Sequence, residues 1–207
     1  MLLDIKKVLK DRGLSPRGVV HVGGNTGEEM NEYLEMGMHD QLWFEPNPTA
    51  FKQLQSKAWR KDRERIKVFN VALGSEPGIY LLNLALNGQS SSLLEPKLHL
   101  DNHPDIEFSG SVAVEVERLD SILEEKGIDP TGWLLCADVQ GYELEVLKGT
   151  GKYLESFSAV YLELNEVEMY KGCALAGQVT DFLWSKGFEL VDVSWTGKGW
   201  GDGLFLK

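Results

Sequence analysis

The stretch that decides the fold reads GVVHVGGNTGEEM and covers residues 18–30. Its first five residues are a short apolar run rich in valine, which is typical of a buried strand. Residues 23–27 then form a glycine-rich turn that leads directly into a stretch of helical period. Because glycine has no Cβ, such a turn lets backbone N–H groups approach a ligand closely. The stretch predicts a nucleotide-type binding turn, and a turn that merely joins a strand to a helix is the alternative.

The dinucleotide fingerprint G-x-G-x-x-G fits this turn only in part. It requires glycine at positions 22, 24 and 27, and Val22 stands at the first of them. The first glycine of the fingerprint permits the tight turn toward the pyrophosphate. NAD is therefore not the ligand that the turn favours.

Apolar runs rich in β-branched residues alternate with segments of helical period, which is typical of βαβ units and a mostly parallel sheet. The expected strands are residues 18–22, 41–45, 66–71, 133–139 and 159–164. The expected helices are residues 28–37, 49–59, 143–147 and 176–186. We therefore expect an α/β fold in a single domain, residues 1–207.

Further segments complete this organisation. Residues 1–14 form an amphipathic pattern closed by a glycine and predict an N-terminal helix. Residues 78–86 and 112–119 predict two additional strands, and the long polar segment between them, residues 87–111, is expected to cover the substrate. The chain closes with a predicted antiparallel hairpin, residues 188–195 and 203–207, joined by the glycine-rich turn TGKGWGDG.

Charge and composition restrict the partners. Lys plus Arg number 21 and Asp plus Glu number 32, and the net charge of −11 repels phosphate backbones, so no nucleic acid partner is expected. The longest stretch without charge, residues 77–94, is too polar to span a bilayer, and the charged N-terminus lacks the apolar core of a signal peptide. Two distant cysteines predict reduced thiols. We expect a cytoplasmic protein without membrane contact, and the oligomeric state stays open.

A carboxylate follows the second expected strand, in the sequence WFEPNP. Glu45 lies 18 positions after Gly27. At the carboxyl end of such a strand, a carboxylate can accept hydrogen bonds from both hydroxyls of a ribose. The alternative is that Glu45 only caps the helix after Pro48. Asn70, Val71 and Ala72, at the end of the third strand, are expected near the same crevice.

The segments GGNTG, FEPNP, NVALG, ERLDSIL and DVQGYELEVLKG occur in an order and spacing that resemble the FkbM-type family of S-adenosylmethionine-dependent methyltransferases. The resemblance spans roughly residues 18 to 165. Its most specific element is Asp138 to Gly149, where Gly141, Glu143 and Leu147 stand in the family pattern D-x-x-G-x-E-x-x-x-L-x-G.

This resemblance implies a class I Rossmann-like methyltransferase fold, a mostly parallel sheet with helices on both faces. It also implies S-adenosylmethionine as cofactor and a hydroxyl group of a sugar or another natural product as acceptor. The residues that it places at the cofactor are His21, Gly23, Gly24, Asn25, Gly27, Glu45, Asn70, Val71, Ala72 and Asp138. His21 stands where many such enzymes carry an acid, and a neutral histidine hydrogen-bonded to the backbone is expected there rather than a base.

Methyl transfer from a sulfonium mainly needs alignment and a group that takes the acceptor's proton. Asp138 and Glu163, near the ends of the fourth and fifth strands, are the expected catalytic residues. Glu143 could instead organise the loop that follows Asp138. Oxygen ligands from Asp138, Glu163 and Asn165 could alternatively hold one Mg²⁺.

Other side chains leave alternatives open. His99 or His103 could supply the base, although loop histidines are more often solvated. Trp200 could stack on a sugar ring or pack in the hairpin, and Trp184 is expected in the core. The first hypothesis is O-methylation of a small molecule or carbohydrate. The alternatives are a nucleotide-dependent oxidoreductase of the NAD type and a non-catalytic nucleotide-binding or partner-binding module.

Overall fold

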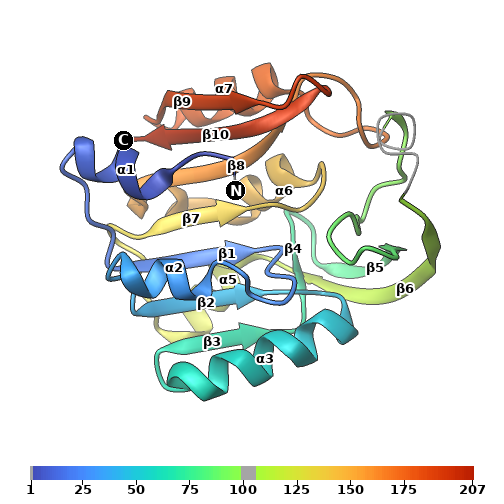
Figure 1. Ribbon diagram of the computed structural model, residues 1–207, viewed down its shortest axis with the longest axis horizontal. Helices are drawn as coiled ribbons and strands as arrows, with labels where there is room; N and C mark the ends of the chain where they lie inside the picture. The colour runs from blue at the N-terminus through green and yellow to red at the C-terminus, as the bar shows by residue number, and fades with distance from the viewer. Residues whose placement is uncertain (1, 99–105) are drawn as a thin grey trace.

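The computed structural model describes residues 2–98 and 106–207, and its central element is a seven-stranded sheet (Figure 1). The strand order is β3-β2-β1-β7-β8-β10-β9. The first five of these strands are parallel, and β10 runs antiparallel to both of its neighbours. The bounds are β1 (Gly18–Val22), β2 (Asp40–Phe44), β3 (Ile66–Phe69), β7 (Leu134–Ala137), β8 (Ala159–Asn165), β9 (Glu189–Trp195) and β10 (Trp200–Leu206). The α/β class, the mostly parallel sheet and the C-terminal antiparallel hairpin are confirmed.

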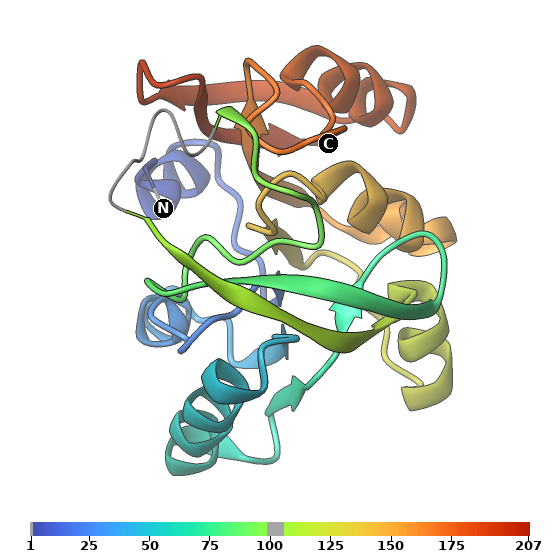
Figure 2. The same ribbon diagram turned by 90° about the vertical axis from the view of Figure 1, so that its right-hand side faces the viewer.

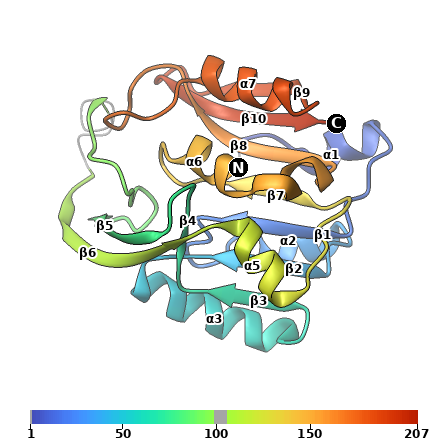
Figure 3. The same ribbon diagram turned by 180° about the vertical axis from the view of Figure 1, so that it is seen from behind.

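Helices cover both faces of this sheet (Figures 1 and 3). One layer consists of α1 (Ile5–Asp11), α2 (Met30–Glu35) and α3 (Pro48–Asp62). The other consists of α5 (Leu119–Lys126), α6 (Glu143–Gly149), the short 3₁₀ helix η1 (Gly151–Ser156) and α7 (Ala176–Ser185). Strands β1, β7 and β8, in the middle of the sheet, are buried on both faces, which explains why their sequences are mostly apolar runs.

The alternation of side chains along β1 divides the core into two clusters. Val19 packs in the cluster that contains α1, α2 and α3, whereas Val20 and Val22 pack in the cluster that contains α5, α6 and α7. His21 has the same parity as Val19 and lies at the carboxyl end of the strand. The core cluster beneath α1, α2 and α3 therefore ends, at the carboxyl edge of the sheet, in the polar side chain of His21.

A second sheet of three strands crosses the carboxyl ends of the parallel strands (Figure 2). Its order is β4-β6-β5, with β4 (Ala72–Leu73), β5 (Gly78–Ala85) and β6 (Phe108–Glu117). The strand expected over residues 66–71 is thus shorter, since the chain leaves the main sheet after Phe69 and pairs with β6 at Ala72. This sheet holds the segment after β5 above the strand ends.

Several expected bounds are corrected. The last strand begins at Trp200 rather than at residue 203, so Trp200 belongs to β10 and not to the turn. Trp184 is 65% exposed, not in the core, because α7 buries Val179 and Leu183 instead.

His99 and His103 lie outside the described residues. Among the residues that the structure describes, no helix combines the length and the apolar run needed to cross a bilayer.

Candidate functional site

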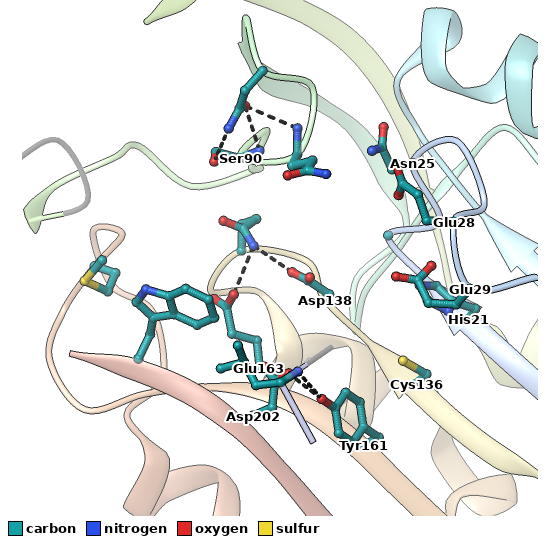
Figure 4. A pocket seen from close by; sticks show the side chains of 18 of the residues that line it. His21, Asn25, Glu28, Glu29, Ser90, Cys136, Asp138, Tyr161, Glu163 and Asp202 are labelled. Carbon is teal, nitrogen blue, oxygen red and sulfur yellow. Dashed lines mark hydrogen bonds between the residues drawn. The ribbon is translucent and has the colours of Figure 1, made fainter. Parts of the chain in front are cut away.

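A cavity of about 390 Å³ opens at the carboxyl ends of the parallel strands (Figure 4). The ends of β1, β7 and β8 line one side of it together with β10. Asn87, Gln89 and Ser90, from the segment after β5, line the opposite side. In an open α/β sheet this edge is where ligands bind. A second cavity of about 50 Å³ adjoins it, and both are lined by Gly23, Asn25, Gln89 and Asp138.

The glycine turn reaches the larger cavity through Gly23, Gly24 and Asn25, whereas Gly27 does not line it. Packing within the protein is a further reason for these glycines. A Cβ on Gly23 would lie 1.9 Å from the carbonyl oxygen of Asp138, and one on Gly27 would meet Leu54 at 2.7 Å. These glycines therefore permit close packing of protein against protein, and Gly23 and Gly24 do so in the wall of the larger cavity.

The N–H groups of the turn also differ from the expectation. Gly23 and Gly24 both donate to the carbonyl oxygen of Phe44, and Gly27 donates to Gly24. Asn25, with a left-handed φ of 40°, donates its N–H to Oε2 of Glu45 at 2.7 Å. These four N–H groups are occupied within the protein, so they determine the shape of the cavity wall.

His21 lines the larger cavity as a neutral side chain. Its Nδ1 lies 2.8 Å from the hydroxyl of Tyr33, and its ring stacks on Trp43 with centroids 4.3 Å apart. Burial lowers the pKa of His21 to about 4. The expected neutral histidine is present, with a tyrosine hydroxyl as partner in place of a backbone group.

Glu45 lines the smaller cavity and joins two turns. Its Oε2 accepts from the Asn25 N–H and its Oε1 from the Asn47 N–H, each at 2.7 Å. Asn47 itself caps α3, since its side chain accepts from the N–H of Thr49. Burial raises the pKa of Glu45 to about 7. Each carboxylate oxygen has a second lone pair, so Glu45 can still accept hydrogen bonds from a ligand.

The residues after β3 divide between two roles. Ala72 lines the smaller cavity, and Val71 packs against the core. The Asn70 amide donates to the carbonyl oxygens of Glu45 and Pro46 at 2.8 and 3.1 Å. Asn70 and Val71 lie outside the lining of both cavities. The hydrogen bonds of Asn70 instead hold the backbone at Glu45 and Pro46 in place.

Asp138 and Glu163 face the larger cavity from neighbouring strands (Figure 4). Asp138 is accessible from the cavity yet deep in the molecule, and desolvation by the surrounding protein raises its pKa to about 6. Glu163 is buried, and desolvation together with the charge of Asp138 raises its pKa well above the usual range. The two carboxyl groups thus differ in their tendency to ionise, which is typical of sites that transfer protons.

Glu143 lies behind the loop that carries Asp138. Its Oε1 accepts from the N–H groups of Val139 and Gly141 at 3.0 and 3.2 Å. Burial raises its pKa to about 7. Glu143 does not line either cavity, so its contacts are those of a residue that organises the loop.

Sequence reasoning missed several lining residues: Glu28, Glu29, Gln140, Tyr161, Tyr170 and Asp202. Glu28 and Glu29 directly follow the glycine turn, and this position in the sequence could have indicated that they lie at the cavity. Asp202 carried no signal, because only the antiparallel register of β10 places it opposite Glu163. Trp200, in contrast, was singled out and does line the cavity.

The larger cavity is strongly acidic. Its described lining contains the carboxyl groups of Glu28, Glu29, Asp138, Glu163 and Asp202 and no lysine or arginine. Such a lining favours a cationic ligand. The expectation of a Mg²⁺ site finds no support: within residues 2–98 and 106–207 no three His, Cys, Asp or Glu side chains are grouped as metal ligands. The amide of Asn165 is buried without a hydrogen-bond partner among these residues.

Comparison with known proteins identifies one family. The family model for the methyltransferase FkbM domain matches residues 21–190. The chain is 31% identical over 182 residues to the 2-O-methyltransferase NoeI of Sinorhizobium fredii, covering 84% of this chain and 72% of that protein.

Solved structures share the fold at low sequence identity. The crystal structure of methyltransferase FkbM from Methylobacillus flagellatus KT superposes with a TM-score of 0.61 at 14% identity over 93% of this chain. This chain spans only 44% of that protein. Magnesium protoporphyrin IX methyltransferase from Synechocystis PCC 6803, solved with bound SAM, gives a TM-score of 0.54 at 11% identity, over 98% of this chain and 76% of that one. These structures show a Rossmann-like methyltransferase fold.

Proposed function

This chain belongs to the FkbM family of methyltransferases, and on that premise we propose that it transfers a methyl group from S-adenosylmethionine to a hydroxyl of an uncharged sugar or similar polyol. The observation that carries the proposal is the acidic cavity at the strand ends, which adjoins the cavity at Glu45. Its carboxylates suit a cationic cofactor, and its size leaves room for a second ligand.

The described residues fit the cofactor at two places. Glu45 is suited to the ribose, since both of its oxygens retain an acceptor lone pair. Glu28, Glu29 and Asp138 are suited to the ammonium and sulfonium charges. The smaller cavity, at about 50 Å³, holds only a few water molecules, so binding an adenosine there requires the segment over residues 88–93 to move outward.

When bound, S-adenosylmethionine supplies a methyl group whose bond to sulfur breaks with its electron pair returning to sulfur, as an oxygen lone pair of the acceptor forms the new C–O bond. The protein must then remove the hydroxyl proton. Asp138 suits this task because it is accessible from the cavity and its pKa of about 6 leaves it ionised at neutral pH. Burial and the charge of Asp138 raise the pKa of Glu163 beside it well above the usual range, and in its protonated form Glu163 can donate to the acceptor.

The acceptor is expected on the side of Trp200 and Asp202, both on β10. An indole ring offers a flat apolar surface for a pyranose, and a carboxylate accepts hydrogen bonds from its hydroxyls. An anionic group would meet several carboxylates without a compensating cation. The acidic lining therefore favours an uncharged acceptor over a phosphorylated or uronic one.

The test is methyl transfer from radiolabelled S-adenosylmethionine to matched acceptors. Methyl β-D-glucopyranoside and other neutral methyl pyranosides are compared with methyl β-D-glucuronide, which differs from the first by one carboxylate. The expected product is an alkali-stable methyl ether on a neutral pyranoside, with the glucuronide at least tenfold slower. Absence of transfer to every neutral acceptor, or a preference for the anionic one, contradicts the proposal.

The two alternatives predict different results. An NAD-dependent oxidoreductase would bind NAD rather than S-adenosylmethionine, and a non-catalytic module would bind a nucleotide without turnover. No contact among the described residues favours either alternative over methyl transfer. Titration with NAD and with S-adenosylmethionine distinguishes the oxidoreductase from a methyltransferase. The transfer assay distinguishes the non-catalytic module from a methyltransferase.

A further inference from the structure

Gln140 connects the two carboxylates of the larger cavity, and nothing in the proposed reaction yet uses it. Its Nε2 donates to Oδ1 of Asp138 at 2.6 Å and to Oε2 of Glu163 at 3.1 Å. The two carboxylates come from neighbouring strands, β7 and β8, and one amide group therefore joins both strand ends. Figure 4 shows these two hydrogen bonds as dashed lines that end on Asp138 and Glu163.

The backbone holds Gln140 in an uncommon conformation. Its φ is 56°, in the left-handed region that is unfavourable for a residue with a side chain. Glu143 supports this conformation, since its carboxylate accepts from the N–H groups on either side, those of Val139 and Gly141. Such a conformation persists where surrounding contacts determine it, as they do at functional sites.

Two further hydrogen bonds determine the position and orientation of Gln140. The hydroxyl of Tyr170 donates to its Oε1 at 2.6 Å, so the amide nitrogen faces the carboxylates and the amide oxygen faces the tyrosine. The reversed amide would place its oxygen against two carboxylates. The hydroxyl of Ser92 donates to the backbone carbonyl oxygen of Gln140 at 2.7 Å. Ser92 lies on the segment that moves outward when the cofactor binds, so Tyr170 is the partner that orients the amide in the complex.

The amide favours ionisation of one carboxyl group over the other. A hydrogen bond donated to a carboxylate stabilises its charged form, and the contact with Asp138 is the shorter of the two. Other charged and titratable groups interact with the pair from the neighbouring elements: Glu29 before α2, Glu143 on α6, Asp202 on β10 and Tyr170 after β8. Gln140 is the described side chain that donates a hydrogen bond to both members.

We propose that Gln140 is a positioning residue for methyl transfer, which holds Asp138 ionised and oriented as the proton acceptor and Glu163 beside it as the protonated partner. The proton passes from the acceptor hydroxyl to Asp138 while the hydroxyl oxygen forms its bond to the methyl carbon. The inference rests on the proposed function. In it, one neutral amide keeps one of two adjacent carboxyl groups ionised while the other is protonated.

The test compares Q140M, which has similar length and no hydrogen-bonding group, with the wild type. Carbon-13 NMR of labelled carboxyl groups follows the ionisation of Asp138 and Glu163 without any acceptor, with signals assigned through Asp138→Asn and Glu163→Gln. We expect the Asp138 midpoint to rise by about one pH unit in Q140M. Single-turnover methylation of a neutral methyl pyranoside should slow at least tenfold at neutral pH, while KM for S-adenosylmethionine changes less than threefold.

Two more variants sharpen the result. Tyr170→Phe frees the amide to rotate, and it should shift the midpoint in the same direction by less. In Q140E a third carboxyl group replaces the hydrogen-bond donor and raises the Asp138 midpoint further, so the activity profile should shift to higher pH than that of the wild type. Q53M, on the exposed face of α3, is the matched control and should leave rate and pH profile unchanged.

The outcomes separate this inference from the proposed function. If the wild type methylates and Q140M retains its rate and its Asp138 midpoint, Gln140 has no positioning role although the function stands. If Q140M does not fold, Q140E decides, and a pH profile that superposes on that of the wild type overturns the inference. A wild type that neither binds S-adenosylmethionine nor methylates contradicts the proposed function itself.

Discussion

Asp138 combines access from the cavity with a pKa near neutrality. Its carboxyl group follows a buried strand, and the depth of the site, rather than a single neighbour, raises its pKa to about 6. At a lower pKa the carboxylate would be a weaker base, and at a higher one it would be protonated at neutral pH. The environment at the end of β7 therefore suits the removal of a hydroxyl proton.

Asp138→Asn keeps the shape of this side chain and removes its basicity. We expect the single-turnover rate of methyl transfer to fall by roughly 10² to 10⁴, because this is the usual contribution of a positioned base. Circular dichroism should show an unchanged fold. A rate within threefold of the wild type at neutral pH would exclude Asp138 as the base.

Glu45→Gln tests the cofactor at the other end of the site. Loss of the charge-assisted acceptor for the ribose should weaken S-adenosylmethionine binding about 10- to 100-fold. Calorimetry measures the dissociation constant, and Glu64→Gln on the surface is the matched control. Equal affinity of both variants would show that Glu45 does not contact the cofactor.

At the residue scale, the sequence was informative where a side chain directly follows a strand. Glu45 and Asp138 were placed at one edge of the sheet for that reason, and the structure brings them to adjoining cavities. Gln140 and Asp202 were not predicted. The role of Gln140 depends on a left-handed φ, and that of Asp202 on the register of an antiparallel strand.

Among the elements, those buried on both faces were the most predictable. The expected bounds of β1, β2 and β8 agree with the structure within one residue, because their apolar runs end where burial ends. Helix α5 was missed, although the left-handed glycine at its C-cap, Gly127, and Lys126 in its last turn were available as signals of a helix end. The second sheet depends on long-range pairing between β5 and β6 that local patterns do not specify.

The turn after β1 predicts a strong effect on stability. Gly23→Ala adds a Cβ that collides with the backbone of Asp138 and also strains a φ of 83°, so the free energy of unfolding should fall by about 3 kcal/mol or more. Gly37→Ala is the matched control, because φ is 85° there and the added Cβ meets nothing within 4 Å. It should cost roughly 1 to 2 kcal/mol. Urea unfolding measures both, and equal losses would show that the collision is relieved.

For the whole molecule, the concentration of carboxyl groups at one edge of the sheet links cofactor binding to pH. Burial raises the pKa of Asp138 to about 6 and that of Glu45 to about 7, so in the free protein Glu45 takes up protons near neutral pH and Asp138 about one pH unit lower. A cationic ligand favours the ionised forms and lowers these pKa values in the complex. Binding must therefore release protons in this range.

The affinity for S-adenosylmethionine should consequently fall as the pH is lowered through 7 and then 6. Calorimetry in buffers of different ionisation enthalpy measures the released protons. S-adenosylhomocysteine, whose thioether is neutral, should show a weaker pH dependence. Proton uptake on binding, or identical pH profiles for both ligands, would mean that the sulfonium does not face these carboxylates.

The most direct test is a crystal structure of the protein with S-adenosylmethionine. We predict that the ribose hydroxyls contact the carboxylate of Glu45, that the segment over residues 88–93 moves outward, and that the sulfonium methyl points into the larger cavity toward Asp138. A cofactor bound away from Glu45, or with its methyl group turned away from Asp138, would contradict the account.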